Sequence, residues 1–241
     1  MIELTNISVF SDKGKRTENE DRASFLIGSS PGEVLLVLAD GMGGHEGGEV
    51  ASELVTQTLL HYFAEHGFEP PEQQLEDALK KTQQCVLQNV IDSPQYTGMG
   101  STVVAVTVRP EKGVVASVGD SRAYQFRDDC VRRLTRDDLY VSHLLGIDDR
   151  VARKHPQGHV LSQAIGIDGD LTPHIHGFDV QPADIFLLCS DGVHEVLNEP
   201  TMRMIIATSK PAEAAMRIVH AAMDAGSTDN CSAVVAQMPQ R

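Results

Sequence analysis

Apolar residues follow two spacings along the chain, one typical of strands and one typical of helices. Short runs rich in Val, Ile, Leu and Ala predict strands, and they cover residues 23–28, 33–39, 101–108, 113–119, 122–126, 184–190 and 232–238. Apolar positions three or four residues apart predict two long helices, one marked by Ala51, Leu54, Val55, Thr58 and Tyr62 and the other by Leu75, Leu79, Thr82, Val86 and Val90. A further helix is predicted from Pro211, a favoured first-turn residue, to Gly226.

The order of these elements indicates the fold class. Two helices follow one another early, and strands joined by short turns then come in succession, which is not the alternation of a parallel βαβ sheet. This order predicts an α+β architecture in which helices cover antiparallel sheets. With 241 residues, the chain suits a single domain over residues 1–241.

Composition and charge limit the classes of binding partner and the cellular compartment that the sequence favours. The formal net charge of −14 disfavours a nucleic-acid backbone or an anionic membrane surface as a partner. No apolar run approaches the roughly 20 residues of a membrane span, and the first residues lack the pattern of a signal peptide. Three of the four cysteines lie in apolar runs and none forms a Cys-x-x-Cys pair, so reduced core residues are expected. These features predict a cytoplasmic protein without direct membrane insertion.

Acidic residues recur where the predicted strands begin or end. They are Glu20, Asp21, Asp40, Asp120, Asp191 and Asp229. One such Asp is usually a turn former, but the strand ends of a sandwich gather at a common edge, so we expect these carboxylates to share a small volume. Unit charges ~4 Å apart repel by about 4 kcal/mol at an effective dielectric of 20. Such a cluster therefore raises its pKa values or binds cations.

The stretch 34-VLLVLADGMGGHEGGEVASELV-55 adds glycine to this acidic pattern. All-oxygen ligation selects hard ions, Mg²⁺ or Mn²⁺ before Ca²⁺. Because glycine allows close approach to the main chain, Gly41 is a candidate to offer its carbonyl as a ligand. Gly43 and Gly44 are expected to leave open space above the ions.

A set of motifs in a fixed order now points to a family. In sequence order they are 14-GKRTENED-21, 39-ADGMGGH-45, 98-GMGSTVV-104, 119-GDSRAY-124, 190-SDG-192 and 228-TDN-230. The chain resembles the PPM (protein phosphatase 2C-like) family of metal-dependent serine/threonine phosphatases, in its bacterial branch. The resemblance implies two antiparallel β-sheets packed as a central sandwich and flanked by helix pairs, in α-β-β-α layers.

What the resemblance implies for the two core metal ions is carried over position by position. Asp40 matches the carboxylate that bridges both ions, and the Gly41 carbonyl matches a ligand of the second ion. Asp191 and Asp229 match side-chain ligands of the first ion.

Further residues match the family's outer metal and phosphate positions. Glu20 and Asp21 match the acidic pair beside the second ion. Asp120 matches a residue that helps to hold a third, weaker ion, and Arg16 matches the arginine that binds the substrate phosphate.

The resemblance also implies the reaction. It is hydrolysis of phosphoserine or phosphothreonine in proteins by a hydroxide that bridges two Mn²⁺ or Mg²⁺ ions, without a phosphoenzyme intermediate. Arg16, Asp40 and Asp191 are the residues expected to carry it. A phosphorylated protein is the expected substrate, a bacterial Ser/Thr kinase is expected to act in opposition, and a monomer is expected.

One departure concerns the general acid. Met42 stands where many eukaryotic relatives carry a histidine that is a candidate acid, and His45, three residues on, is a less favoured replacement. A metal-bound water, or an acid on residues 137–166, is favoured instead.

Residues 137–166 occupy the place of the family's flap, a mobile lid that touches the phosphoprotein, and an ordinary surface insertion is the alternative. Its histidines, His143, His155 and His159, are interpreted as facing solvent.

Two other functions stay open from the sequence. One is a regulatory pseudophosphatase of the same fold, although such relatives usually lack one or more of the metal aspartates and all are present here. The other, from a different class, is a non-enzymatic calcium-binding module, which no EF-hand spacing supports. Manganese-dependent hydrolysis of p-nitrophenyl phosphate separates these possibilities.

Overall fold

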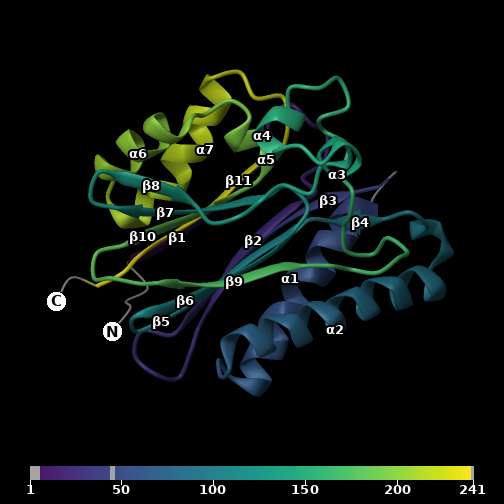
Figure 1. The fold of residues 1–241 in the computed structure, drawn as a ribbon, viewed down its shortest axis with the longest axis horizontal. Helices are drawn as coiled ribbons and strands as arrows, with labels where there is room; N and C mark the ends of the chain where they lie inside the picture. The colour runs from purple at the N-terminus through teal and green to yellow at the C-terminus, as the bar shows by residue number, and fades with distance from the viewer. Residues whose placement is uncertain (1–5, 44–46, 240–241) are drawn as a thin grey trace.

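The computed structural model describes residues 6–43 and 47–239, and in it two β-sheets pack face to face between two layers of helices (Figure 1). One sheet has the strand order β1-β11-β10-β7-β8 and the other β2-β3-β5-β6-β9, with the short β4 paired to β3. Every strand pair in the described residues is antiparallel. The predicted α+β fold and its α-β-β-α layers are confirmed.

The element bounds show how the chain divides between the sheets. The first sheet contains β1 (Ile7–Asp12), β7 (Arg122–Arg127), β8 (Cys130–Arg133), β10 (Ile185–Cys189) and β11 (Cys231–Gln237). The second contains β2 (Asp21–Ile27), β3 (Val34–Met42), β4 (Gly100–Ser101), β5 (Val103–Arg109), β6 (Lys112–Val118) and β9 (His174–Asp179).

The helices cover the outer faces and one end of the sandwich. They are α1 (Gly47–His66), α2 (Pro71–Asp92), α3 (Tyr140–Leu145), α4 (Asp149–Ala152), α5 (Asp191–His194), α6 (Glu199–Ala207) and α7 (Ala214–Asp224), with 3-10 turns at Pro94–Tyr96 and Pro211–Glu213. None of the helices within residues 6–43 and 47–239 has the length and apolar character needed to cross a membrane.

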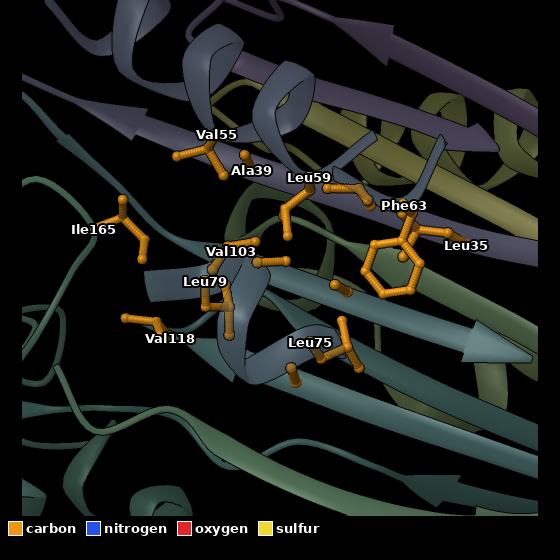
Figure 2. Packing of buried hydrophobic residues seen from close by; sticks show 14 of the residues in the cluster. Leu35, Ala39, Val55, Leu59, Phe63, Leu75, Leu79, Val103, Val118 and Ile165 are labelled. Carbon is orange, nitrogen blue, oxygen red and sulfur yellow. The ribbon is translucent and has the colours of Figure 1, made fainter. Parts of the chain in front are cut away.

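The apolar run of β3 is continuous because both of its faces are covered. Leu35, Val37 and Ala39 pack in the cluster under α1 and α2, where Figure 2 shows Leu35 near Phe63. The alternating residues Leu36 and Leu38 pack between the two sheets. A third cluster fills the space between the first sheet and helices α6 and α7. A strand held on both faces is a rigid support for whatever its end carries.

The predicted elements are confirmed where the hydrophobic pattern is strong. Each predicted strand overlaps an observed one, and the helix predicted from Pro211 starts as a 3-10 turn and continues as α7 before Gly226, which has a φ of 98°. The prediction missed β1, β8, β9, α4, α5 and α6. Of the three cysteines in apolar runs, Cys189 and Cys231 are buried as expected and Cys85 is partly buried, whereas Cys130, outside those runs, is exposed.

Residues 137–166 form a small unit with its own apolar interior near the end of β3 (Figure 1). Leu139, Val141 and Ala152 are buried together, and an isolated bridge joins Leu139 to Leu161. Of the helical patch expected around Val141, Leu144 and Leu145, only Val141 is buried. Leu144 and Leu145 point outward because α3 packs through one narrow face only.

Candidate metal centre

The strand ends bring the acidic residues of the sequence to one end of the sandwich. Asp21 at the start of β2 lies directly opposite Asp40 near the end of β3. Asp191 follows β10 as the first residue of α5, and Asp229 precedes β11. Asp120 lies in the turn between β6 and β7. The predicted convergence is therefore found, and it joins residues from both sheets.

Hydrogen bonds between the sheets hold this arrangement. The Ser190 hydroxyl donates to Asp21 Oδ2 at 2.8 Å, and it accepts from the Ser232 backbone N–H at 3.0 Å. The side-chain oxygen of Asn230 accepts from the backbone N–H of Glu20 at 2.9 Å. Because β2 belongs to one sheet and β10 and β11 to the other, these bonds lock the two halves of the site together.

Burial and mutual repulsion dominate the electrostatics of the cluster. Burial raises the pKa of Asp40 well above its usual range, and the charges of Asp21, Asp191 and Asp120 add to the rise. Burial, with repulsion from Asp120 and Asp229, raises the pKa of Asp191 to about 8. Burial also raises the pKa of Asp21 to about 6, against hydrogen bonds from neighbouring serines that lower it. Shifts in this direction show that the site lacks positive charge for its carboxylates.

The donor set fits hard divalent cations. Asp21 Oδ1 is buried and has no hydrogen-bond partner in the described structure, although Asp21 Oδ2 is bonded. A buried carboxylate oxygen without a partner is costly, and an oxygen-binding cation would satisfy it. The surrounding side chains offer carboxylate oxygens, which Mg²⁺ and Mn²⁺ prefer.

Two of the carboxylates contact arginines. Arg16 Nη2 donates to Asp229 Oδ2 at 2.8 Å, and Arg153 Nη2 donates to Asp120 Oδ2 at 2.8 Å. No three acidic, histidine or cysteine side chains within residues 6–43 and 47–239 already surround one common ion position. A metal site that included Asp229 and Asp120 would require both carboxylates to turn away from these guanidinium groups.

Gly41 and Gly43 of the ADGMGGH motif pack closely against neighbouring parts of the chain. A Cβ on Gly41 would lie 1.9 Å from the Gly48 carbonyl oxygen at the start of α1. A Cβ on Gly43 would lie 3.1 Å from Met99 Cα, so this glycine also packs closely, and its expected role above the ions stays a prediction. Gly44 and His45 lie outside the described residues, so the expectations for both stay predictions.

A pocket of about 410 Å³ opens on the cluster. Its lining residues are Asp40, Met42, Thr102, Asp120, His159, Val160, Leu161 and Asp191. His159 is exposed, as expected for the histidines of residues 137–166, but it faces this pocket. Phosphate-sized groups can therefore reach the carboxylates beside Met42 and His159.

Sequence reasoning missed several residues that support the site. Ser190 and Asn230 are adjacent to metal-motif aspartates in SDG and TDN, so their position in the motifs was the available signal. Thr102 Oγ1 accepts from the Asp40 backbone N–H at 3.0 Å and lies 2.7 Å from Ser121 Oγ. Arg153 carries no local signal, because its contact with Asp120 spans 33 residues.

Comparison with known proteins supports the same conclusion. Residues 12–225 match the family described as protein phosphatase 2C. The chain belongs to this family. The family predicted from the ordered motifs is therefore confirmed, and three of the motif carboxylates, Asp40, Asp120 and Asp191, line one pocket.

This chain is similar to two bacterial phosphatases over nearly its whole length. It is 32% identical over 232 residues to the serine/threonine protein phosphatase PstP of Mycobacterium tuberculosis, covering 95% of this chain but 44% of that protein. It is 31% identical over 236 residues to the serine/threonine phosphatase stp of Listeria innocua, covering 94% of this chain and 93% of that one. Thus the chain spans less than half of one relative and nearly all of the other.

A solved structure is similar in fold. The catalytic domain of PstP, in complex with two manganese ions, superposes with a TM-score of 0.84 at 30% identity, covering 97% of this chain and 98% of that one. The fold that presents the acidic cluster is therefore shared with a protein that holds manganese.

The raised pKa of Asp191 predicts a pH dependence of stability. A carboxyl whose folded pKa lies above its unfolded value contributes stability below the unfolded pKa and loses it as pH rises through the folded pKa. In metal-free protein, we expect Asp191→Asn to gain stability relative to the unsubstituted protein between pH 5 and pH 8, by about 2 kcal/mol or more. Urea denaturation in the presence of chelator measures this difference. The control is Asp168→Asn, which removes an exposed charge, and parallel pH curves for the two variants would contradict the prediction.

Proposed function

We propose that this chain hydrolyses phosphoserine and phosphothreonine in proteins with the help of bound Mn²⁺ or Mg²⁺. The observation that carries the proposal is that Asp40 and Asp191 line one pocket, that the buried Asp21 lies opposite Asp40, and that all three have raised pKa values. The family and the manganese-bound PstP domain support it. The pseudophosphatase and the calcium module are less favoured, because the metal-motif aspartates converge and the family is one of phosphatases.

Two core ions would be held by groups already near one another. We assign Asp40 to both ions, Asp191 and Asp229 to the first, and the Gly41 carbonyl to the second. Glu20 and Asp21 lie beside the second ion, directly or through water, and the Gly41 backbone N–H donates to the Glu20 carbonyl at 3.0 Å. Asp120 would help to hold a third, weaker ion. When bound, the metal supplies a strong nucleophile at neutral pH by lowering the pKa of a coordinated water.

Arg16 is placed to bind the substrate phosphate. Its side chain is 56% exposed and reaches Asp229, so it lies at the edge of the acidic cluster and open to solvent. A guanidinium group offers two parallel N–H donors to phosphate oxygens. Arg16 would thereby offset the charge of a phosphate dianion that the carboxylates repel.

The described pocket favours direct attack by water. No cysteine lines it, and the Thr102 hydroxyl is occupied by the Asp40 backbone and Ser121. The lining therefore offers no cysteine thiol or free threonine hydroxyl as a nucleophile, and the proposed roles of its aspartates are to hold metal ions. His159 on the same lining supports the expectation that residues 137–166 supply a proton donor for the leaving oxygen.

Residues 137–166 also carry an apolar surface for substrate contact. Large hydrophobic side chains exposed in the described structure are Ile91, Tyr140, Leu144, Leu145, Val151, Val160, Ile167 and Met204. Most of these lie between residues 140 and 167, and Val160 also lines the pocket. We therefore assign this segment as the flap and infer that it contacts apolar residues beside the phosphorylated Ser or Thr. A bacterial Ser/Thr kinase would supply such phosphoproteins.

Metal-dependent turnover is the first test of this function. We expect hydrolysis of p-nitrophenyl phosphate that requires Mn²⁺ or Mg²⁺, and we expect Asp191→Asn to reduce kcat by on the order of 100-fold or more, since it removes a charge from the metal site. Steady-state kinetics with a phosphopeptide extends the measurement to the proposed substrate class. If the folded protein binds Mn²⁺ but shows no turnover, the proposed phosphatase activity is contradicted and a regulatory role is favoured.

The assignment of Arg16 predicts a different kinetic signature. Arg16→Ala is expected to raise KM for p-nitrophenyl phosphate by about 10-fold with a smaller loss of kcat, because a charged hydrogen bond to phosphate is lost. The neighbouring exposed Lys15→Ala removes a similar charge and serves as the control. An unchanged KM in Arg16→Ala would remove this residue from the phosphate site.

The apolar flap surface predicts substrate preference. Replacing Leu144 and Leu145 together by Ser should lower kcat/KM for a phosphopeptide with Leu beside the phosphoserine by roughly 5-fold or more, since apolar contact area is lost. Hydrolysis of p-nitrophenyl phosphate should not change. The matched control replaces the exposed Ile91 and Met204 by Ser. Equal peptide kinetics in both double variants would exclude the flap contact.

A further inference from the structure

Arg153 joins the flap segment to the metal end of the sandwich. It directly follows α4, and its side chain is only 18% exposed. Its Nη2 lies 2.8 Å from Asp120 Oδ2 and 2.9 Å from Asp137 Oδ2, and its Nη1 lies 3.1 Å from Glu195 Oε1. One guanidinium group therefore contacts three carboxylates from different parts of the chain.

Asp120 is fixed in a position where it needs a positive partner. The residue is 5% exposed, and its backbone carbonyl accepts from His194 Nε2 at 2.9 Å. Burial raises the pKa of Asp120, and the charge of Arg153 opposes that rise. A buried carboxylate of this kind is stable as an anion only beside a cation.

Two carboxylates near Arg153 have other partners that would remain if Arg153 moved. Asp137 would keep Arg122, which donates to its two oxygens at 2.9 and 2.6 Å. Asp149, the first residue of α4, would also keep its ion pair with Arg133, so that displacement of Arg153 frees the C-terminal end of α4. Arg153 Nε is buried without a hydrogen-bond partner in the described residues, so its present position satisfies the guanidinium incompletely.

We propose that Arg153 competes with a divalent cation for the Asp120 carboxylate, and that cation binding there releases the α4 end of the flap. This inference rests on the proposed function, since it concerns the weak third site of that metal centre. The Asp120 oxygen that accepts from Arg153 is not free to ligate an ion. A divalent ion beside Asp120 would also repel the guanidinium at short range. Arg153 thus lowers the affinity of the third site and couples its occupancy to flap mobility.

Metal binding tests the competition directly. Isothermal titration with Mn²⁺ alone should show about 10-fold tighter binding at the weakest site of Arg153→Met than in the unsubstituted protein, with the stronger sites unchanged. Arg150→Met is the control, because Arg150 is exposed on the same short helix. Arg153→Lys keeps a charge with shorter reach, and we expect an intermediate affinity. The same weak-site affinity in all these proteins would overturn the proposal.

Hydrogen exchange tests the release of the flap without measuring activity. In the unsubstituted protein, exchange over residues 149–153 should rise as Mn²⁺ fills the weakest site. Arg153→Met should exchange fast at every Mn²⁺ concentration, and Asp120→Asn should show no response at the concentrations that fill the third site. Weak-site filling that leaves exchange over 149–153 unchanged in the unsubstituted protein would overturn the coupling. Absence of any Mn²⁺ binding would instead count against the proposed function.

Discussion

Mutual repulsion among buried carboxylates at one end of the sandwich is the constraint on which the rest of the structure depends. Asp40 lies opposite Asp21 in the β2–β3 pair and is also repelled by Asp191. Burial and repulsion both oppose bringing such charges together. Positive charge is therefore required at this end of the molecule. In the described structure arginines supply part of it, and the chemistry of the donor set points to divalent cations for the remainder.

The hydrophobic interior makes this unfavourable cluster possible. Strand β3 packs with one face under α1 and α2, as Figure 2 shows, and with the other between the sheets. Its position is thus set by burial of apolar area far from the acidic end, which contributes most of the favourable free energy of folding. Ser190 and Asn230 then join the two sheets at the site itself. Rigid packing along the strands lets their ends hold groups that repel one another.

The two arginines at the cluster differ in a way that suggests different roles. Arg16 is 56% exposed and contacts one carboxylate, so it can turn toward a phosphate without leaving buried charges unpaired. Arg153 is 18% exposed and contacts three carboxylates, so its movement changes the balance of charge inside the protein. Exposure therefore separates an arginine suited to substrate binding from one suited to regulating a metal position and the segment above it.

The sequence by itself determined the strongly patterned elements, the ordered acidic motifs and, through them, the family. Strands such as β3 and β11 were predictable because both of their faces are apolar, whereas β9 was missed because Phe178 is its only buried residue. Tertiary structure alone decided that His159 lines the pocket, that Gly43 packs against Met99 and that Arg153 pairs with Asp120. The reason is physical: local pattern encodes which face of an element is apolar, but the energy of a charge depends on its burial and on neighbours distant in sequence, which only the packing of strand ends and flap brings together.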